Sequence, residues 1–152
     1  ASMLICEMAA YYKSQGKTLI DVMNSLYDEF GYYCNTVQSY TFEGAAGMEK
    51  MAAIMDGLRD NKPSSFAGYE VTKIDDYKTS KSTIVKTGEE SEITLPKSNV
   101  LAYTLTNGNK VIVRPSGTEP KIKAYITAIG HSEENAKEIA QRLLDDANEL
   151  MK

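Results

Sequence analysis

The groups best suited to binding an anion are concentrated in residues 114–121, whose sequence is Arg-Pro-Ser-Gly-Thr-Glu-Pro-Lys. Arg114 carries a planar fork of N–H donors that can hold two phosphate oxygens at once. Ser116 and Thr118 add hydroxyl donors, and Gly117 lets the backbone approach a ligand and present its N–H groups. Two prolines stiffen the chain on either side. These residue types favour a phosphate site that needs no metal.

Charge near this segment is mixed. Glu119 would repel a dianion, so we expect its carboxylate to point away, toward Lys121, Lys123 or a sugar hydroxyl. The two lysines offer nearby positive charge and are accessory candidates, as is Glu119. The residues alone also fit a tight hairpin loop, because Ser, Gly, Thr and Pro are common turn formers. Both interpretations stay open at this point.

The elements around the segment are predicted to be strands. Residues 100–105 and 110–113 are rich in β-branched and aromatic types, and Asn107-Gly108 between them tolerates positive φ, which favours a hairpin. A further strand is expected over residues 122–129. Ser132 has the type of an N-cap for a last helix. Its predicted buried stripe comprises Ile139, Leu143, Leu144, Ala147 and Leu150.

The first half of the chain predicts a helix pair and then the start of a sheet. Helical periodicity covers residues 3–14 and 19–30, and Thr18 with Asp21 forms a capping-box pattern. A strand is predicted at 33–42, a helix over 44–61, and a second strand at 69–77. The predicted core face of the 44–61 helix comprises Met48, Met51, Ala52, Met55 and Leu58. Residues 78–98 are polar and are interpreted as a long loop holding a minor hairpin.

From residue 32 onward the predicted order is strand, helix, four strands and helix. That order indicates an α+β fold with an antiparallel sheet and both helices on one face, preceded by a helix pair. The 152 residues, 42% hydrophobic and 25% charged, suit one globular domain with an appendage. The net charge of −4 argues against nucleic acid as a partner. No apolar run reaches the length of a membrane span, so we expect no membrane partner.

Few residues outside the loop are candidates for chemistry. Cys6 and Cys34 are far apart and are interpreted as reduced thiols of a cytoplasmic protein. His131 is the single histidine and has no evident triad partner. The carboxylates are scattered rather than paired. We therefore expect no catalytic residue and no metal site in this chain.

The string from Arg114 to Pro120 closely resembles the phosphate-binding signature of the α-D-phosphohexomutases, a family of phosphoglucomutases and phosphomannomutases. In that family the loop lies in the fourth and last domain, which has a TATA-binding-protein-like β-α-β4-α fold. Residues 1–12 and 16–19 resemble the helical end of the third domain, and are closest to bacterial members. The resemblance implies that residues 1–31 are a helical remnant of the third domain and that residues 32–152 are the C-terminal phosphate-binding domain.

The resemblance also implies an activity for the parent protein. It would be a cytoplasmic isomerase of carbohydrate metabolism, an intramolecular phosphotransferase that interconverts hexose 1-phosphate and hexose 6-phosphate through a bisphosphate. Glucose 1-phosphate, glucose 6-phosphate and mannose phosphates are the implied partners, together with the remaining domains. Arg114, Ser116, Gly117 and Thr118 carry over as contacts to the phosphate that is not being transferred, in a domain that rotates to close the cleft.

The remaining parts of the family's machinery would lie upstream of Ala1. These are the phosphoserine, the aspartates that hold Mg²⁺, and the sugar-reading loop of the third domain. We therefore expect the fragment to be inactive alone and to hold no cofactor. Two alternatives stay open: a stand-alone regulatory domain that binds a small anion, and a module that binds a macromolecule through its open sheet. Nucleic acid is disfavoured because basic and aromatic residues are not interleaved.

Overall fold

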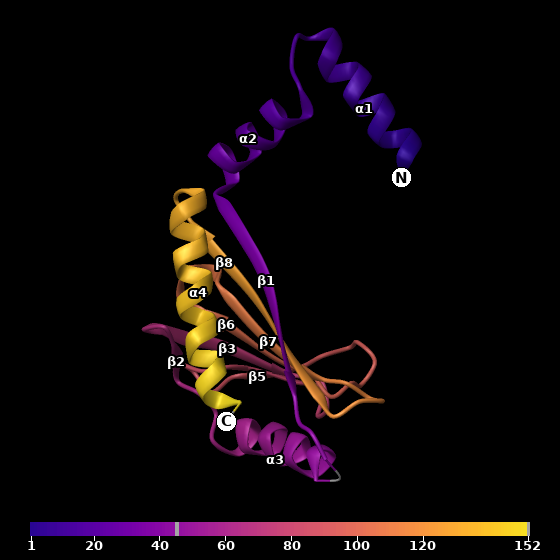
Figure 1. Cartoon of the computed structure of the whole chain (residues 1–152). Helices are drawn as coiled ribbons and strands as arrows, with labels where there is room; N and C mark the ends of the chain where they lie inside the picture. Colours follow the sequence, from indigo (N-terminus) through magenta and orange to yellow (C-terminus); the bar gives the residue numbers. More distant parts are fainter. Residues whose placement is uncertain (45, 152) are drawn as a thin grey trace.

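The chain, described here by a computed structural model at residues 1–44 and 46–151, consists of two leading helices and a domain of mixed strands and helices (Figure 1). The elements in chain order are α1 (Ser2–Ser14), α2 (Leu19–Phe30), β1 (Tyr32–Thr41), α3 (Gly47–Asp60), β2 (Ser65–Phe66), β3 (Tyr69–Asp76), β4 (Lys81–Ile84), β5 (Glu90–Glu92), β6 (Leu101–Leu105), the 3₁₀ turn η1 (Thr106–Gly108), β7 (Lys110–Pro115), β8 (Lys121–Gly130) and α4 (Glu133–Leu150). The predicted α+β class, with an antiparallel sheet after a helix pair, is confirmed.

The strands form one antiparallel sheet in the order β1-β8-β7-β6-β3-β4-β5, and β2 pairs with β3. The four strands predicted after the 44–61 helix are β3, β6, β7 and β8. Residues 78–98 contain the expected hairpin, as β4 and β5. The short strand β2 was not predicted. Asn107 and Gly108 have φ values of 69° and 78°, which confirms the predicted turn between β6 and β7.

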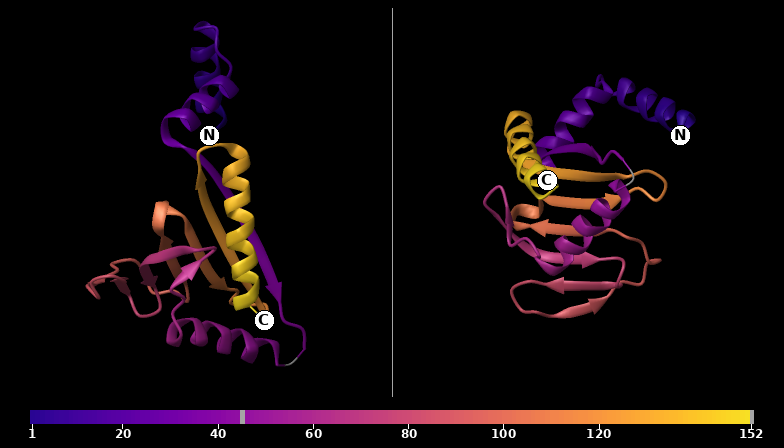
Figure 2. Two further views of the ribbon diagram at one scale, coloured as in Figure 1. Left: turned by 90° about the vertical axis from the view of Figure 1, so that its left-hand side faces the viewer. Right: turned by 60° about the horizontal axis from the view of Figure 1, so that its bottom comes forward.

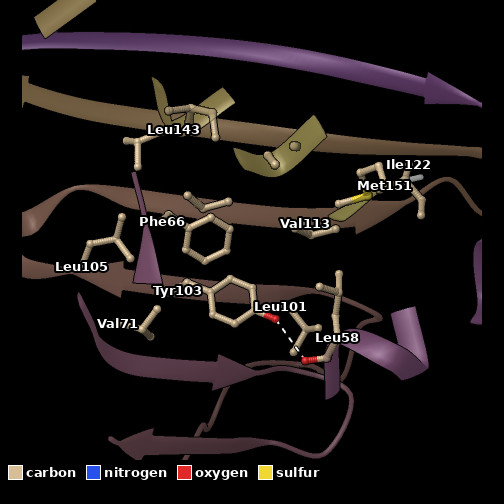
Figure 3. Close-up of a cluster of buried hydrophobic side chains, with 14 of the residues drawn as sticks. Leu58, Phe66, Val71, Leu101, Tyr103, Leu105, Val113, Ile122, Leu143 and Met151 are labelled. Carbon is tan, nitrogen blue, oxygen red and sulfur yellow. Dashed lines mark hydrogen bonds between the residues drawn. The ribbon is translucent and has the colours of Figure 1, made fainter. Parts of the chain in front are cut away.

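The core lies between one face of the sheet and the helices α3 and α4, which both lie on that side of the sheet (Figure 2). Alternate residues of β6, β7 and β8 point into it, as expected for strands with one buried face. Tyr103 is fully buried at its centre, and its hydroxyl donates to the Leu58 carbonyl oxygen over 3.3 Å (Figure 3). This bond fixes the end of α3 against β6.

The helix stripes are narrower than the sequence predicted. In α3, Met51, Met55 and Leu58 are buried, whereas Met48 and Ala52 are exposed. In α4, Ile139, Leu143 and Ala147 are buried as predicted, Leu144 is partly buried, and Leu150 is exposed. Each helix touches the sheet along one line only, so residues at the border of the predicted stripe face solvent. Met151 is buried at the C-terminal end of α4, where Leu150 was expected.

The leading helices extend away from the sheet (Figure 1) and bury no residue of their own. Thr18 caps α2 as predicted: its hydroxyl accepts from the Asp21 amide over 3.2 Å, and the Asp21 carboxylate accepts from the Thr18 amide over 2.8 Å. Large apolar side chains of α1 and α2 are exposed, among them Met3, Leu4, Ile5, Ile20 and Phe30. Residues 1–31 therefore keep helical form without covering the sheet.

Two further observations bear on the expectations from composition. Cys6 and Cys34 are free thiols. Within residues 1–44 and 46–151, no helix combines the length and the apolar character needed to cross a membrane.

Candidate functional site

The candidate site is built on the hairpin of β7 and β8. Arg114 lies directly opposite Lys123 in the antiparallel register, and Val113 lies opposite Ala124. Val113 and Ala124 point into the core, so the alternation of a strand places Arg114 and Lys123 on the other face, where both are exposed. The loop is closed by the Ser116 amide, which donates to the Lys121 carbonyl oxygen over 2.7 Å. The pairing of β7 with β8 thus fixes the backbone positions of Arg114 and Lys123.

The backbone of the loop is partly open to solvent. The Ser116 hydroxyl oxygen accepts from the amides of Thr118 and Glu119, both at 3.4 Å, which is long for a hydrogen bond. Among the described residues, the Gly117 amide donates to no protein group. A Cβ at Gly117 would meet no atom within 4 Å. One amide is therefore free and two are weakly held, in a loop that does not fold inward on itself.

The charges of the loop divide into a neutralised pair and a free pair. Lys121 forms an ion pair with Glu119, with Nζ and Oε2 at 3.1 Å. The predicted orientation of Glu119 away from the site, toward Lys121, is therefore what the structure shows. Arg114 and Lys123 make no ion pair with any residue in the described part of the chain.

These groups surround a concavity of about 310 Å³ on the exposed face of the hairpin. It is lined by Arg114, Pro115, Ser116, Gly117, Thr118, Lys123 and Tyr125. The structure thus brings together the four predicted phosphate contacts and one of the two accessory lysines. Lys121 and Glu119 do not line it. Tyr125 was missed by the sequence analysis, although it lies two residues beyond Lys123 on the same strand and so on the same face.

A second, larger concavity of about 560 Å³ adjoins the first. It is lined on one side by residues 114–117, and on the other by Met48 and Met51 of α3 together with Ser98, Asn99 and Val100. Arg114 lines both concavities. The two concavities therefore meet at the loop.

A third concavity, of about 270 Å³, lies between α3 and β4 and is less suited to an anion. Two of its three cations already have partners: Arg59 pairs with Asp76 at 3.3 Å, and Lys81 pairs with Glu90 at 2.8 Å. The hydrogen bond from Lys81, together with its charge, holds the pKa of Glu90 below its ordinary value. In the concavity at the β7–β8 loop, by contrast, both lining cations are without an ion-pair partner among the described residues, and no carboxylate lines it.

The arrangement of donors can hold an anion. The concavity offers a guanidinium, an ammonium, three hydroxyls and an open amide, which are the donors that phosphate oxygens accept from. Over residues 1–44 and 46–151, no three His, Cys, Asp or Glu side chains gather closely enough to hold a metal ion.

Comparison with known proteins gives consistent matches. A family model described as the C-terminal domain of phosphoglucomutase/phosphomannomutase matches residues 49–146. The chain is 38% identical over 124 residues to a phosphoglucomutase of Staphylococcus haemolyticus and 40% identical over 124 residues to one of Staphylococcus aureus. Each alignment covers 82% of this chain and 22% of the relative, so the chain spans about a fifth of the length of these relatives.

The fold also matches a solved structure, the open form of the exocytosis-sensitive phosphoprotein parafusin, a phosphoglucomutase from Paramecium. The TM-score is 0.60, with 13% identity, over 95% of this chain and 25% of that one. At this identity the match supports the fold alone.

Proposed function

We propose, given that this chain belongs to the phosphoglucomutase/phosphomannomutase family and contains its C-terminal domain, that residues 114–118 with Lys123 bind the phosphate group of a hexose phosphate. The observation that carries the proposal is the concavity in which Arg114 and Lys123, opposite each other and without carboxylate partners among the described residues, face the open amide of Gly117. A dianion placed there gains two charges and several donors without breaking any internal ion pair.

The parent protein is proposed to be an isomerase that interconverts hexose 1-phosphate and hexose 6-phosphate, acting on glucose phosphates and on mannose phosphates in the cytoplasm. Within it, residues 32–152 hold the phosphate that is not being transferred and close the cleft, which excludes water from the reacting groups. Residues 1–31 belong to the preceding domain, which would cover their exposed apolar side chains. The phosphoserine and a magnesium ion are proposed to be supplied by other domains of the parent protein.

The direct test of phosphate binding is an NMR titration of the chain with glucose 1-phosphate. We expect saturable shifts at the amides of Gly117 and Thr118, with weak affinity because one subsite supplies only part of the contacts. Arg114→Ala removes the one arginine among the residues that line the concavity, and with it the fork that can hold two oxygens at once, so it should abolish the shifts. Arg142→Ala is the matched control, because it removes the same charge from an exposed residue of α4.

Two results would count against the proposal. The first is an equal loss of affinity in both arginine variants, since it would mean that only the net charge matters. The second is saturable binding of oligonucleotides with no response to the sugar phosphate, which would favour a macromolecule-binding module. A separate assay with magnesium and glucose 1,6-bisphosphate tests the placement of the phosphoserine outside this chain, and turnover by the chain alone would contradict that placement.

A further inference from the structure

The wall of the larger concavity opposite the loop contains an asparagine whose orientation is fixed from behind. Asn99 precedes β6 and lines the concavity together with Ser98 and Val100. Its side-chain oxygen Oδ1 accepts a hydrogen bond of 2.5 Å from Nη2 of Arg59, a residue of α3. Nothing in the sequence pattern linked Asn99 to Arg59, because the two residues are 40 positions apart.

Arg59 is well placed to fix that orientation. Its side chain is only 13% exposed, and Nε lies 3.3 Å from a carboxylate oxygen of Asp76. Its Nη1 donates to the Met55 carbonyl oxygen over 3.2 Å. An arginine side chain carries donors and no acceptor, so the group of Asn99 that faces it must be the oxygen. The amide NH₂ of Asn99 is therefore directed elsewhere, and it has no hydrogen-bond partner among the described residues.

The rest of the concavity combines apolar and polar surface. Met48, Met51 and Pro115 supply apolar area, and Ser98 supplies an exposed hydroxyl beside the amide of Asn99. A sugar ring has C–H surface and several hydroxyl groups, so it suits a site with both kinds of contact. The shared residue Arg114 joins this site to the phosphate concavity, and α3 lies beside the β7–β8 loop (Figure 2).

We infer that Asn99 donates a hydrogen bond to a hydroxyl of the sugar whose phosphate the loop holds, and that Arg59 is the positioning residue that keeps this donor directed into the concavity. The inference rests on the proposed phosphate-binding function of the loop. It assigns part of the recognition of the sugar to the same domain that binds the phosphate. The carboxylate of Asp76 and the carbonyl of Met55 hold Arg59 whether or not a ligand is present, so the donor is oriented before binding.

The test compares two ligands, glucose 1-phosphate and inorganic phosphate, by NMR titration of the Gly117 and Thr118 amides. In Asn99→Ala we expect affinity for glucose 1-phosphate to fall by about two- to tenfold, the worth of one hydrogen bond, and affinity for inorganic phosphate to stay unchanged. Arg59→Lys keeps a positive charge beside Asp76 but loses the fork that reaches Asn99, so it should produce the same selective loss. Asn61→Ala, at the C-cap of α3 two residues beyond Arg59, removes an amide side chain that lines neither concavity, so it is the matched control and should change neither affinity.

The outcomes separate this inference from the function on which it rests. Unchanged affinity for glucose 1-phosphate in Asn99→Ala would refute the role of Asn99. Equal weakening of both ligands in either variant would mean that the substitution merely disturbs the loop, and would refute the role too. If inorganic phosphate shifts the loop amides of the natural chain but not of Arg114→Ala, the proposed function stands in either case. If inorganic phosphate shifts the loop amides of neither the natural chain nor Arg114→Ala, the proposed function fails, and the inference fails with it. Thermal melting of each variant confirms that the fold is retained.

Discussion

Lys123→Ala should weaken phosphate binding by about four- to fivefold at physiological ionic strength. Lys123 lies opposite Arg114, lines the phosphate concavity and has no carboxylate partner among the described residues. Its side chain is exposed, so an effective dielectric constant near that of water applies. At about 5 Å, a unit charge and a phosphate dianion interact by about 1.7 kcal/mol in water, and a Debye length of about 8 Å reduces this to about 0.9 kcal/mol.

The chain offers a matched control on the same face of the same hairpin. Lys110 is exposed and lies four residues from Arg114 along β7. At about 3.3 Å per residue the two are about 13 Å apart, where the same estimate gives only about 0.1 kcal/mol. Lys110→Ala should therefore lower phosphate affinity by no more than about a quarter, although it changes the net charge equally.

The assay is an NMR titration with inorganic phosphate, carried out at two ionic strengths. The difference between the two variants should grow at low salt, because the interaction of Lys123 with the anion is then less screened. Equal effects of the two substitutions would refute the local argument, since they would show that phosphate responds to net charge rather than to this pair of residues. No effect of Lys123→Ala at either salt concentration would remove Lys123 from the site.

Three other changes test the charges and packing around the site. Glu119→Gln should strengthen phosphate binding in the same titration, since it removes a negative charge and frees Lys121; weaker binding would indicate that the carboxylate itself contacts the ligand. Tyr103→Phe should lower the free energy of unfolding in urea by about 1 kcal/mol, because the Leu58 carbonyl loses its buried donor. Burial raises the pKa of Tyr103, so the folded state keeps a proton that the unfolded chain releases above about pH 10. The free energy of unfolding should therefore fall as pH rises above that value, and less steeply in Tyr103→Phe. The same dependence on pH in both proteins would show that Tyr103 is not its cause. Gly130→Ala places a Cβ 2.5 Å from the Ala136 amide nitrogen, so the melting temperature should drop, and an unchanged melting temperature would mean that α4 shifts freely on β8.

Features of the fold that depend on neighbouring residues were predictable from the sequence. Asn107-Gly108 predicted a hairpin because both residues adopt positive φ readily, and both do. Thr18 with Asp21, and Ser132 before α4, predicted helix starts because their side chains satisfy amides that the helix leaves free. The sequence also predicted the segment of the candidate site, because Arg114 and the loop after it are contiguous.

Features that depend on distant residues were not predictable. The turn before β3 places Ala67 at a φ of 50°, which alanine rarely adopts. The Ala67 amide is held there by the Asp146 carboxylate of α4, over 2.6 Å and across 79 positions of sequence. The link from Arg59 to Asn99 is of the same kind. Met48 was expected in the core from periodicity, yet it lies at the edge of α3 and borders a concavity instead.

The distribution of ion pairs indicates that the proposed site lowers the stability of the fold when no anion is bound. Lys121, Arg59 and Lys81 are each neutralised by a carboxylate, whereas Arg114 and Lys123 face each other across two paired strands. Like charges directly opposite in a sheet are destabilising by up to about 1 kcal/mol. Lys123→Ala should therefore stabilise the chain in the absence of phosphate and also reduce the stabilisation that phosphate gives. A structural hairpin would gain from replacing one of the two cations. An arrangement that keeps both is expected where an anion completes it, since the dianion turns the repulsion between the two side chains into attraction toward a shared centre.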